Sequence, residues 1–385
     1  MAALGRFSYM PNYQGSPPPG GRCAYRSVAD PGRVMIVDDS GVLRGVVAQW
    51  IEREPDLEVV ARHANGRLAV NDVAHSAPDV IILDIDMPVM DGLEALPLLT
   101  KACPDARILM VSTLTRRNAQ ISLKALELGA IDCLPKPEAQ RDIVGLPEFH
   151  RALLRKVRGL VRWRPHAGGY RAPTVPAERF ARRAFSSRRP QAIVIASSTG
   201  GPEALGRLLA ALAPSLGQTP VLIAQHMPPL FTAALAERLS RVAGIEAVEA
   251  RDGEEIAAGR VYVAPGDGHM TITPGAPPRI AIGQGPAINF CRPSADALFE
   301  SAANVFASRT LGIVLTGMGA DGAQGARQIA DAGGSVIAQD FGSSIIWGMP
   351  GAAAETGACA AILPLDEIAA TAGRLLAGEQ PRGLP

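Results

Sequence analysis

Short apolar runs alternate with amphipathic stretches along residues 33–137. Five of the runs have the length of buried strands and end at polar or turn-forming residues. Between them, apolar residues recur at the three- or four-residue spacing of a helix with one buried face. Strands that alternate with helices predict a doubly wound, flavodoxin-like sheet of five parallel strands. The predicted strands cover 33–40, 57–65, 79–88, 106–114 and 131–137, and the predicted helices cover 42–54, 66–77 and 123–130.

The same alternation returns from residue 191 onward. It predicts a second, larger domain of the doubly wound α/β class over residues 191–378. No fixed-period repeat is visible, so a solenoid is not expected. Strands are predicted at 191–197, 220–226, 259–265, 279–283, 311–317 and 334–340, with helices at 205–213, 231–242, 294–307 and 326–333.

Two stretches do not follow this alternation. Residues 1–32 are rich in Gly, Pro and Ser and predict a flexible leader. Residues 138–190 are basic, and from Arg151 to Pro190 twelve Lys and Arg residues face a single acid, Glu178. This charge is compatible with an anionic partner. A position between two α/β units favours a solvated basic linker instead, in which the first half, residues 152–163, can form an amphipathic helix.

Composition and charge describe an ordinary globular protein, with 47% hydrophobic and 19% charged residues. A formal net charge of +1 provides no overall attraction to nucleic acid or anionic membrane. No apolar run approaches the ~18–20 residues needed to span a bilayer, and the first residues lack the apolar core of a signal peptide. We therefore expect a cytoplasmic protein with no membrane insertion and no nucleic-acid partner.

The five cysteines, at positions 23, 103, 133, 291 and 359, are an odd number without metal-ligand spacing. This pattern predicts reduced, buried thiols.

Chemically active side chains stand where the five N-terminal strands end. Asp38 and Asp39 follow the first strand, Asp84 the third, Ser112 the fourth and Lys136 the fifth. Because the carboxyl ends of parallel strands line one crevice, these side chains are expected to converge. Clustered carboxylates are ligands for a hard cation such as Mg²⁺, and a lysine beside them can hold a phosphoryl group.

A second set of strand ends carries a serine, a histidine and an aspartate, in that order. They are Ser198 in SSTGGP, His226 in AQHMP and Asp321 in TGMGADG. A hydroxyl, an imidazole and a carboxylate together form an activated nucleophile, which predicts a serine hydrolase. The motif is not G-x-S-x-G, and the order is not that of the α/β-hydrolases, so an ordinary lipase or esterase is a poor match.

The N-terminal pattern resembles the receiver domain of bacterial response regulators over about residues 33–137. The stretch LDIDMPVMDGLEAL is especially similar to that family. The resemblance implies Asp84 as the phosphoacceptor. It also implies Mg²⁺ ligands from Asp39, Asp84 and the backbone carbonyl of Asp86, with Asp38 assisting. Ser112 and Lys136 would contact the phosphoryl group.

The C-terminal motifs resemble the chemotaxis protein-glutamate methylesterases, the CheB family, over about residues 191–375. SSTGGPEAL, AQHMP, VAPGDGHM, CRPSADALFESAA and LTGMGADGA occur in the order of that family. The resemblance implies Ser198, His226 and Asp321 as catalytic residues, with the backbone N–H of Met318 as an oxyanion donor. Thr199, His269 and Arg292 are implied to line the site.

The resemblance implies hydrolysis of glutamate γ-methyl esters on methyl-accepting chemoreceptors and deamidation of receptor glutamines, without an organic cofactor. A chemotaxis histidine kinase would donate the phosphoryl group, and the unphosphorylated receiver would cover the hydrolase crevice. Two rival hypotheses stay open. One is a receiver-controlled binding module that has kept the fold without catalysis. The other is a nucleic-acid-binding regulator that uses the basic stretch.

Overall fold

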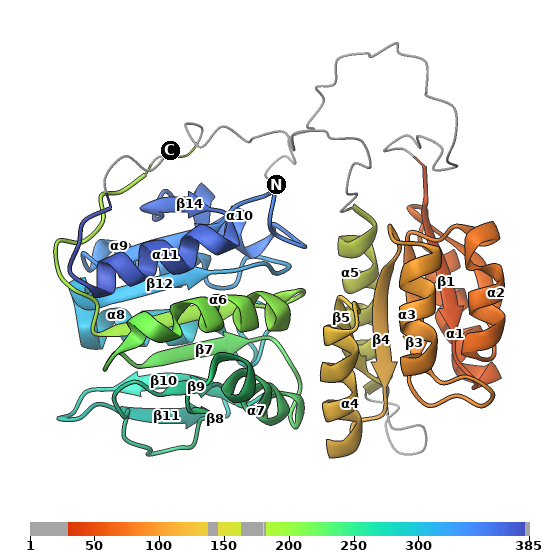
Figure 1. The fold of residues 1–385 in the computed structure, drawn as a ribbon, viewed down its shortest axis with the longest axis horizontal. Coiled ribbons are helices and arrows are strands. Elements are labelled where there is room, and N and C mark those ends of the chain that lie inside the picture. The colour runs from red at the N-terminus through yellow and green to blue at the C-terminus, as the bar shows by residue number, and fades with distance from the viewer. Residues whose placement is uncertain (1–29, 138–144, 163–179, 181, 382–385) are drawn as a thin grey trace, which may run out of the picture.

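A computed structural model describes residues 30–137, 145–162, 180 and 182–381 of the chain (Figure 1). The expected leader and the greater part of the expected linker lie outside these residues. The described chain forms two α/β bodies, each built on its own parallel sheet. Both sheets agree with the doubly wound fold class that the apolar pattern predicts.

The first body has a five-stranded parallel sheet in the order β2-β1-β3-β4-β5. Its central strands are apolar on both faces because helices cover both sides. Its elements are β1 (Gly32–Val37), α1 (Gly41–Glu52), β2 (Leu57–His63), α2 (Gly66–Ser76), β3 (Val80–Asp84), α3 (Gly92–Ala102), β4 (Arg107–Ser112), α4 (Arg116–Glu127), β5 (Asp132–Pro135) and α5 (Gly145–Arg162).

Helix α5 lies within the basic stretch 138–190 and contains most of the amphipathic helix expected over residues 152–163. Its apolar side chains Phe149, Leu153, Val157 and Leu160 are buried against the strands of the first sheet. Val161 packs so close to Gly32 of β1 that a methyl group on that glycine would overlap it. Residues 145–162 of the basic stretch therefore cover one face of the first sheet, because their apolar positions follow a helical spacing.

The second body has a seven-stranded parallel sheet in the order β14-β13-β12-β6-β7-β9-β8. Helices α6, α7 and α11 cover one face, and α8, α9 and α10 cover the other. Its elements are β6 (Ala192–Ser197), α6 (Gly201–Leu216), β7 (Val221–Gln225), α7 (Phe231–Ala243), β8 (Ala247–Glu249), β9 (Val261–Val263), β10 (His269–Thr273), β11 (Arg279–Gly283), α8 (Ala295–Phe306), β12 (Thr310–Val314), α9 (Ala323–Asp331), β13 (Ser335–Gln339), α10 (Met349–Glu355), β14 (Ala361–Leu363) and α11 (Leu365–Leu376).

One predicted strand of the second body does not join the main sheet. Residues 279–283 form β11, which pairs antiparallel with β10 in a separate two-stranded sheet. An apolar run of five residues shows that a strand forms, but it does not show which strand it will pair with.

The order in which strands are added to the second sheet reverses at β6. From β6 the chain continues to β7 on one side, and after α8 it returns to β12 on the other side. In open α/β sheets the crevice at such a topological switch point is where ligands bind. The loops that follow β6, β7 and β12 therefore border the expected site.

The two bodies pack directly against each other. Figure 1 shows α4, β5 and α5 on the side of the first body that faces the second, where α4 packs against α6 and α7. Arg238 of α7 is 5% exposed and donates from Nε to Glu127 of α4 at 3.1 Å. The first body thus lies against the helices that flank the crevice of the second.

Candidate active site

Ser198, His226 and Asp321 come from the three loops at the switch point. Ser198 directly follows β6, His226 directly follows β7, and Asp321 lies in the loop between β12 and α9. The backbone N–H of His226 donates to the carbonyl of Ser197 at 3.1 Å, which ties the first two loops together. The backbone N–H of Ser198 donates to the carbonyl of Thr316 at 3.1 Å, which ties the first loop to the third.

The turn that carries Ser198 depends on two glycines. Gly200 has φ of +77°, in the left-handed region that favours glycine. A methyl group on Gly317 would stand 2.9 Å from the Cβ of Ser198, so only glycine lets the loop after β12 approach the serine. The neighbouring Ser197 is fully buried and donates to Gln225 at 2.6 Å, whereas Ser198 is 8% exposed at the start of α6.

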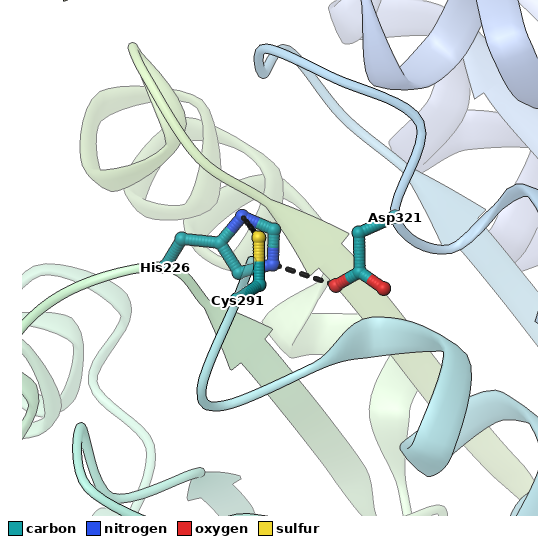
Figure 2. Close-up of side chains that lie close together, drawn as sticks. All are labelled: His226, Cys291 and Asp321. Atoms are coloured by element: carbon teal, nitrogen blue, oxygen red, sulfur yellow. Dashed lines mark hydrogen bonds and ion pairs between the residues drawn. The ribbon is translucent and has the colours of Figure 1, made fainter. Parts of the chain in front are cut away.

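His226 and Asp321 form a direct pair. The Nε2 of His226 lies 2.8 Å from Oδ2 of Asp321, and Figure 2 shows the ring edge directed at the carboxylate. Burial lowers the pKa of His226, but the hydrogen bond to Asp321 and the contact with Cys291 outweigh it and raise the pKa to about 9. Burial acts to raise the pKa of Asp321, yet its bond to His226 and its other donors lower it to about 2. The carboxylate is therefore ionised and orients the ring.

A ring of donors fixes Asp321 in place. Its carboxylate accepts from the backbone N–H of Ala295 at 2.6 Å, the hydroxyl of Ser294 at 2.8 Å and the amide of Asn289 at 3.3 Å. Asp321 is 1% exposed, so these donors replace the water that the carboxylate loses. The pairing leaves Nδ1 of His226 as the ring nitrogen available to act as a base.

Cys291 lies beside that second nitrogen, and the sequence analysis did not place it in the site. Its Sγ stands 3.6 Å from Nδ1 of His226, and Figure 2 shows the thiol against the imidazole ring. The expectation of buried thiols holds for Cys133 and Cys359, but Cys103 and Cys291 are only half-buried, and Cys23 lies outside the described residues. A signal was available in the sequence, because Cys291 begins the stretch CRPSADALFESAA that resembles the methylesterases.

The structure does not join Ser198 to His226. Within the described ranges, the hydroxyl of Ser198 makes no hydrogen bond, and Nδ1 of His226 faces Cys291. If the two residues act together, the hydroxyl of Ser198 has to come within reach of that nitrogen in the substrate complex. Catalytic hydrogen bonds commonly tighten only in that complex.

The residues predicted to line the site have different partners. The hydroxyl of Thr199 donates to Asp132 of the first body at 2.7 Å. His269 accepts from the backbone N–H of Ser294 at 3.1 Å, so it braces the segment that holds Asp321. Arg292 is exposed and donates to the carbonyl of Gly285 at 3.2 Å.

Met318 meets α5 of the first body. A methyl group on Gly159 would stand 2.0 Å from Cε of Met318 and 2.8 Å from Cδ1 of Ile346. Among the described residues, none accepts a hydrogen bond from the backbone N–H of Met318. That donor is therefore free for an incoming oxygen.

The acidic pocket of the first body gathers the residues that the sequence predicted at its strand ends. Lys136 forms ion pairs with Asp38 at 2.8 Å and with Asp84 at 2.6 Å. The carboxylates of Asp38, Asp39 and Asp84 lie within 4.8 Å of one another. Burial raises the pKa of Asp84 to about 6, Lys136 opposes the rise and Asp38 adds to it. Three carboxylates beside a single lysine form an oxygen-rich site that suits a hard divalent cation.

Two further predicted residues of this pocket have partners of their own. Ser112 is fully buried, and its hydroxyl lies 3.2 Å from that of Ser122. The carboxylate of Asp86 accepts from the side-chain amide of Asn118 at 3.1 Å.

Comparisons with known proteins agree with both halves of this architecture. Residues 193–372 match the model of the CheB methylesterase family, and residues 34–146 match the response regulator receiver domain. The second match extends past residue 137 into α5. In the described residues, no helix has the length and apolarity needed to cross a membrane.

Full-length relatives are similar over nearly the whole chain. The protein-glutamate methylesterase/protein-glutamine glutaminase of Rhodopseudomonas palustris strain HaA2 is 49% identical, over 91% of this chain and 96% of the relative. A homologue of the same name, numbered 2, from Caulobacter vibrioides is 48% identical over 87% and 96%. The crystal structure of the Thermotoga maritima CheB methylesterase catalytic domain is 37% identical, covers 48% of this chain and 98% of its own, and has a TM-score of 0.47. The chain belongs to the receiver-containing CheB family of protein-glutamate methylesterases and protein-glutamine glutaminases.

Proposed function

We propose that Ser198, His226 and Asp321 carry out the ester and amide hydrolysis of this methylesterase, and that the receiver restrains them until Asp84 is phosphorylated. The substrates are glutamate γ-methyl esters and glutamine side chains of methyl-accepting chemoreceptors. The observation that carries the proposal is the 2.8 Å pair of His226 with Asp321 at the switch-point crevice, on loops that are hydrogen-bonded to the loop of Ser198.

In the proposed mechanism, Ser198 loses its proton to Nδ1 of His226 while its oxygen attacks the substrate carbonyl. Asp321, held on Nε2, keeps the ring in this orientation and stabilises its charged form. The protonated ring then gives its proton to the leaving methanol, or to ammonia from a glutamine. Water releases the acyl group through the same nitrogen.

Backbone donors stabilise the tetrahedral oxyanion. The free N–H of Met318 is one candidate, and the N-terminus of α6 next to Ser198 supplies others, together with positive partial charge. Each such donor contributes about 3–4 kcal/mol to transition-state stabilisation. Because these donors come from the backbone, side-chain substitutions nearby test them only indirectly.

Contacts across the domain boundary support restraint by the receiver. Asp132 of β5 holds the hydroxyl of Thr199, the residue after the nucleophile. Gly159 of α5 sits against Met318, the candidate oxyanion donor. A receiver in this position covers two elements of the catalytic site, so displacing it exposes both.

Phosphorylation of Asp84 would supply the displacement. Asp38, Asp39 and Asp84, with the carbonyl of Asp86, would hold a Mg²⁺ ion that supports phosphoryl transfer from a chemotaxis histidine kinase. Lys136 pairs with Asp84 in the unphosphorylated chain and would be drawn to the phosphoryl group instead. Repacking around the phosphoryl group would shift the population of domain arrangements toward an open site.

The basic stretch gives little support to a nucleic-acid function. Two of its described cations already have acidic partners within the receiver: Lys156 pairs with Asp132, and Arg158 pairs with Asp56 at 2.9 Å. The remainder of the stretch lies largely outside the described residues.

Methanol release from methylated receptor tests the proposal, measured with and without a small phosphodonor plus Mg²⁺. We expect stimulated release from the intact chain, none from Ser198→Ala and unstimulated release from Asp84→Asn. Receptor binding without any release would instead favour the non-catalytic binding module.

A further inference from the structure

The thiol of Cys291 and the imidazole of His226 are arranged like two ligands of one metal ion. Their Sγ and Nδ1 atoms lie 3.6 Å apart. On tetrahedral zinc, a sulfur at about 2.3 Å and a nitrogen at about 2.0 Å are about 3.5 Å from each other. The separation of the two atoms is therefore already that of two ligands on one zinc ion.

The opposite side of the ring is also arranged as in metal sites. Asp321 holds Nε2 at 2.8 Å, which leaves the lone pair of the neutral ring on Nδ1, the nitrogen 3.6 Å from the thiol. A carboxylate on the distal nitrogen fixes the tautomer of metal-bound histidines and strengthens them as ligands. His226, Cys291 and Asp321 also present donor atoms within 4.8 Å of one another. Because Asp321 already accepts from several backbone and side-chain donors, we assign it the supporting position and not a place on the ion.

The turn that carries Cys291 is anchored in the catalytic network. Ile288 and Cys291 exchange two backbone hydrogen bonds, at 3.1 and 2.8 Å, and close a tight turn. Asn289 within this turn donates to Asp296 at 2.8 Å and to Asp321 at 3.3 Å. The turn that carries the sulfur is therefore tied through Asn289 to Asp321, the carboxylate partner of His226.

We propose that Cys291 and His226 form a binding site for a thiophilic divalent cation, Zn²⁺ in the first instance, which blocks the hydrolase when it binds. Sulfur and imidazole donors select zinc over Mg²⁺ and Ca²⁺, which prefer oxygen. The ion occupies the lone pair of Nδ1 that the proposed mechanism needs to accept the proton of Ser198. Water and incoming ligands complete its coordination. The block rests on the proposed function, whereas the binding does not.

Cobalt substitution reports the site without reference to turnover, because a thiolate bound to Co²⁺ gives a charge-transfer absorption that oxygen ligands do not. The full-length, reduced, metal-free chain is titrated with Co²⁺ in excess Mg²⁺, which occupies the receiver pocket. We expect the thiolate band in the intact chain, its displacement by Zn²⁺, and its loss in Cys291→Ser. Cys103→Ser, which removes the other half-buried thiol among the described residues, is the matched control and should retain the band.

Methanol release then measures the consequence of binding. Half-inhibition of Cys291→Ser should need at least about tenfold more Zn²⁺ than half-inhibition of the intact chain. Each rate is compared with the zinc-free rate of the same protein. A chelator should restore methanol release by the zinc-inhibited intact chain. A missing thiolate band, or a band that survives in Cys291→Ser, would overturn the site. If the intact chain releases no methanol while the band is present, the proposed function has failed and the metal site stands.

Discussion

The hydrogen bond from Thr199 to Asp132 offers a direct measure of how firmly the receiver holds the catalytic domain. Its length is 2.7 Å, and the two residues are 1% and 3% exposed. A bond to a buried charged group contributes about 1.5–3 kcal/mol. Asp132 also accepts from the backbone N–H of Cys133 and pairs with Lys156, so the carboxylate keeps partners without Thr199. The lower figure, about 1.5 kcal/mol, is therefore the appropriate one.

Thr199→Val retains the shape of the side chain and removes the bond. A loss of about 1.5 kcal/mol from the closed arrangement raises the open fraction about tenfold, as long as the closed arrangement dominates. The assay is methanol release by the unphosphorylated chain, divided by release at saturating phosphodonor. This ratio cancels any direct effect on catalysis, because Thr199 adjoins the proposed nucleophile.

We expect the ratio to rise about tenfold in Thr199→Val and to return toward the original value in Thr199→Ser, which restores a hydroxyl. An unchanged ratio in Thr199→Val would refute the reasoning, because the bond would then add nothing to closure. Equal rises in the valine and serine variants would show that packing around Thr199, and not its hydroxyl, holds the domains together.

Three further predictions follow from the same contacts. Gly159→Leu should raise the activity of the unphosphorylated chain several-fold, because the new side chain must displace Met318. The substitution should not unfold α5, since replacing a helical glycine stabilises a helix by up to about 1 kcal/mol. No rise in methanol release would count against closure by α5. The pKa of His226 is raised to about 9 and the mechanism needs its unprotonated form, so kcat/KM should increase with pH up to about pH 9. A plateau of kcat/KM that begins near pH 6.5 would contradict this. Asp321→Asn should shift the rise of kcat/KM toward lower pH and reduce turnover about 10⁴-fold, and Ser198→Ala should abolish methanol release. If either variant releases methanol at a rate within tenfold of the intact chain, the substituted residue does not belong to the triad.

The raised pKa of His226 also has a consequence for stability. A group whose pKa is higher in the folded chain stabilises the fold fully below its ordinary value, near 6.5, and loses that contribution as the pH rises through about 9. The lowered pKa of Asp321 acts in the opposite direction, and its contribution is lost as the pH falls toward 2. Thermal unfolding of the intact chain and of Asp321→Asn across this range checks both signs, and superimposable curves would contradict them.

Local patterns in the sequence predicted most of the strands and the residues at their ends. The apolar run before Ser198 is long enough for one buried strand, and Pro202 in the Gly-Gly-Pro that follows favours the start of a helix. Because parallel strands place their carboxyl ends together, the order of strands and helices was enough to bring His226, Asp321 and Ser198 to one edge. The same reasoning brought Lys136 to Asp84 in the receiver.

Only the tertiary structure decided which strands pair and what the loops bring to the site. Residues 279–283 read as a strand but pair in a separate hairpin, since partner choice depends on distant surfaces. The apolar spacing of residues 152–163 allows a helix, but the burial of α5 against β1 depends on the finished sheet. Cys291 lies 65 positions from His226 in the chain and reaches it through a tight turn. Asp132 lies 67 positions from Thr199 and contacts it across a domain boundary. Contacts of this kind carry no local periodicity, and they exist only once both sheets have packed.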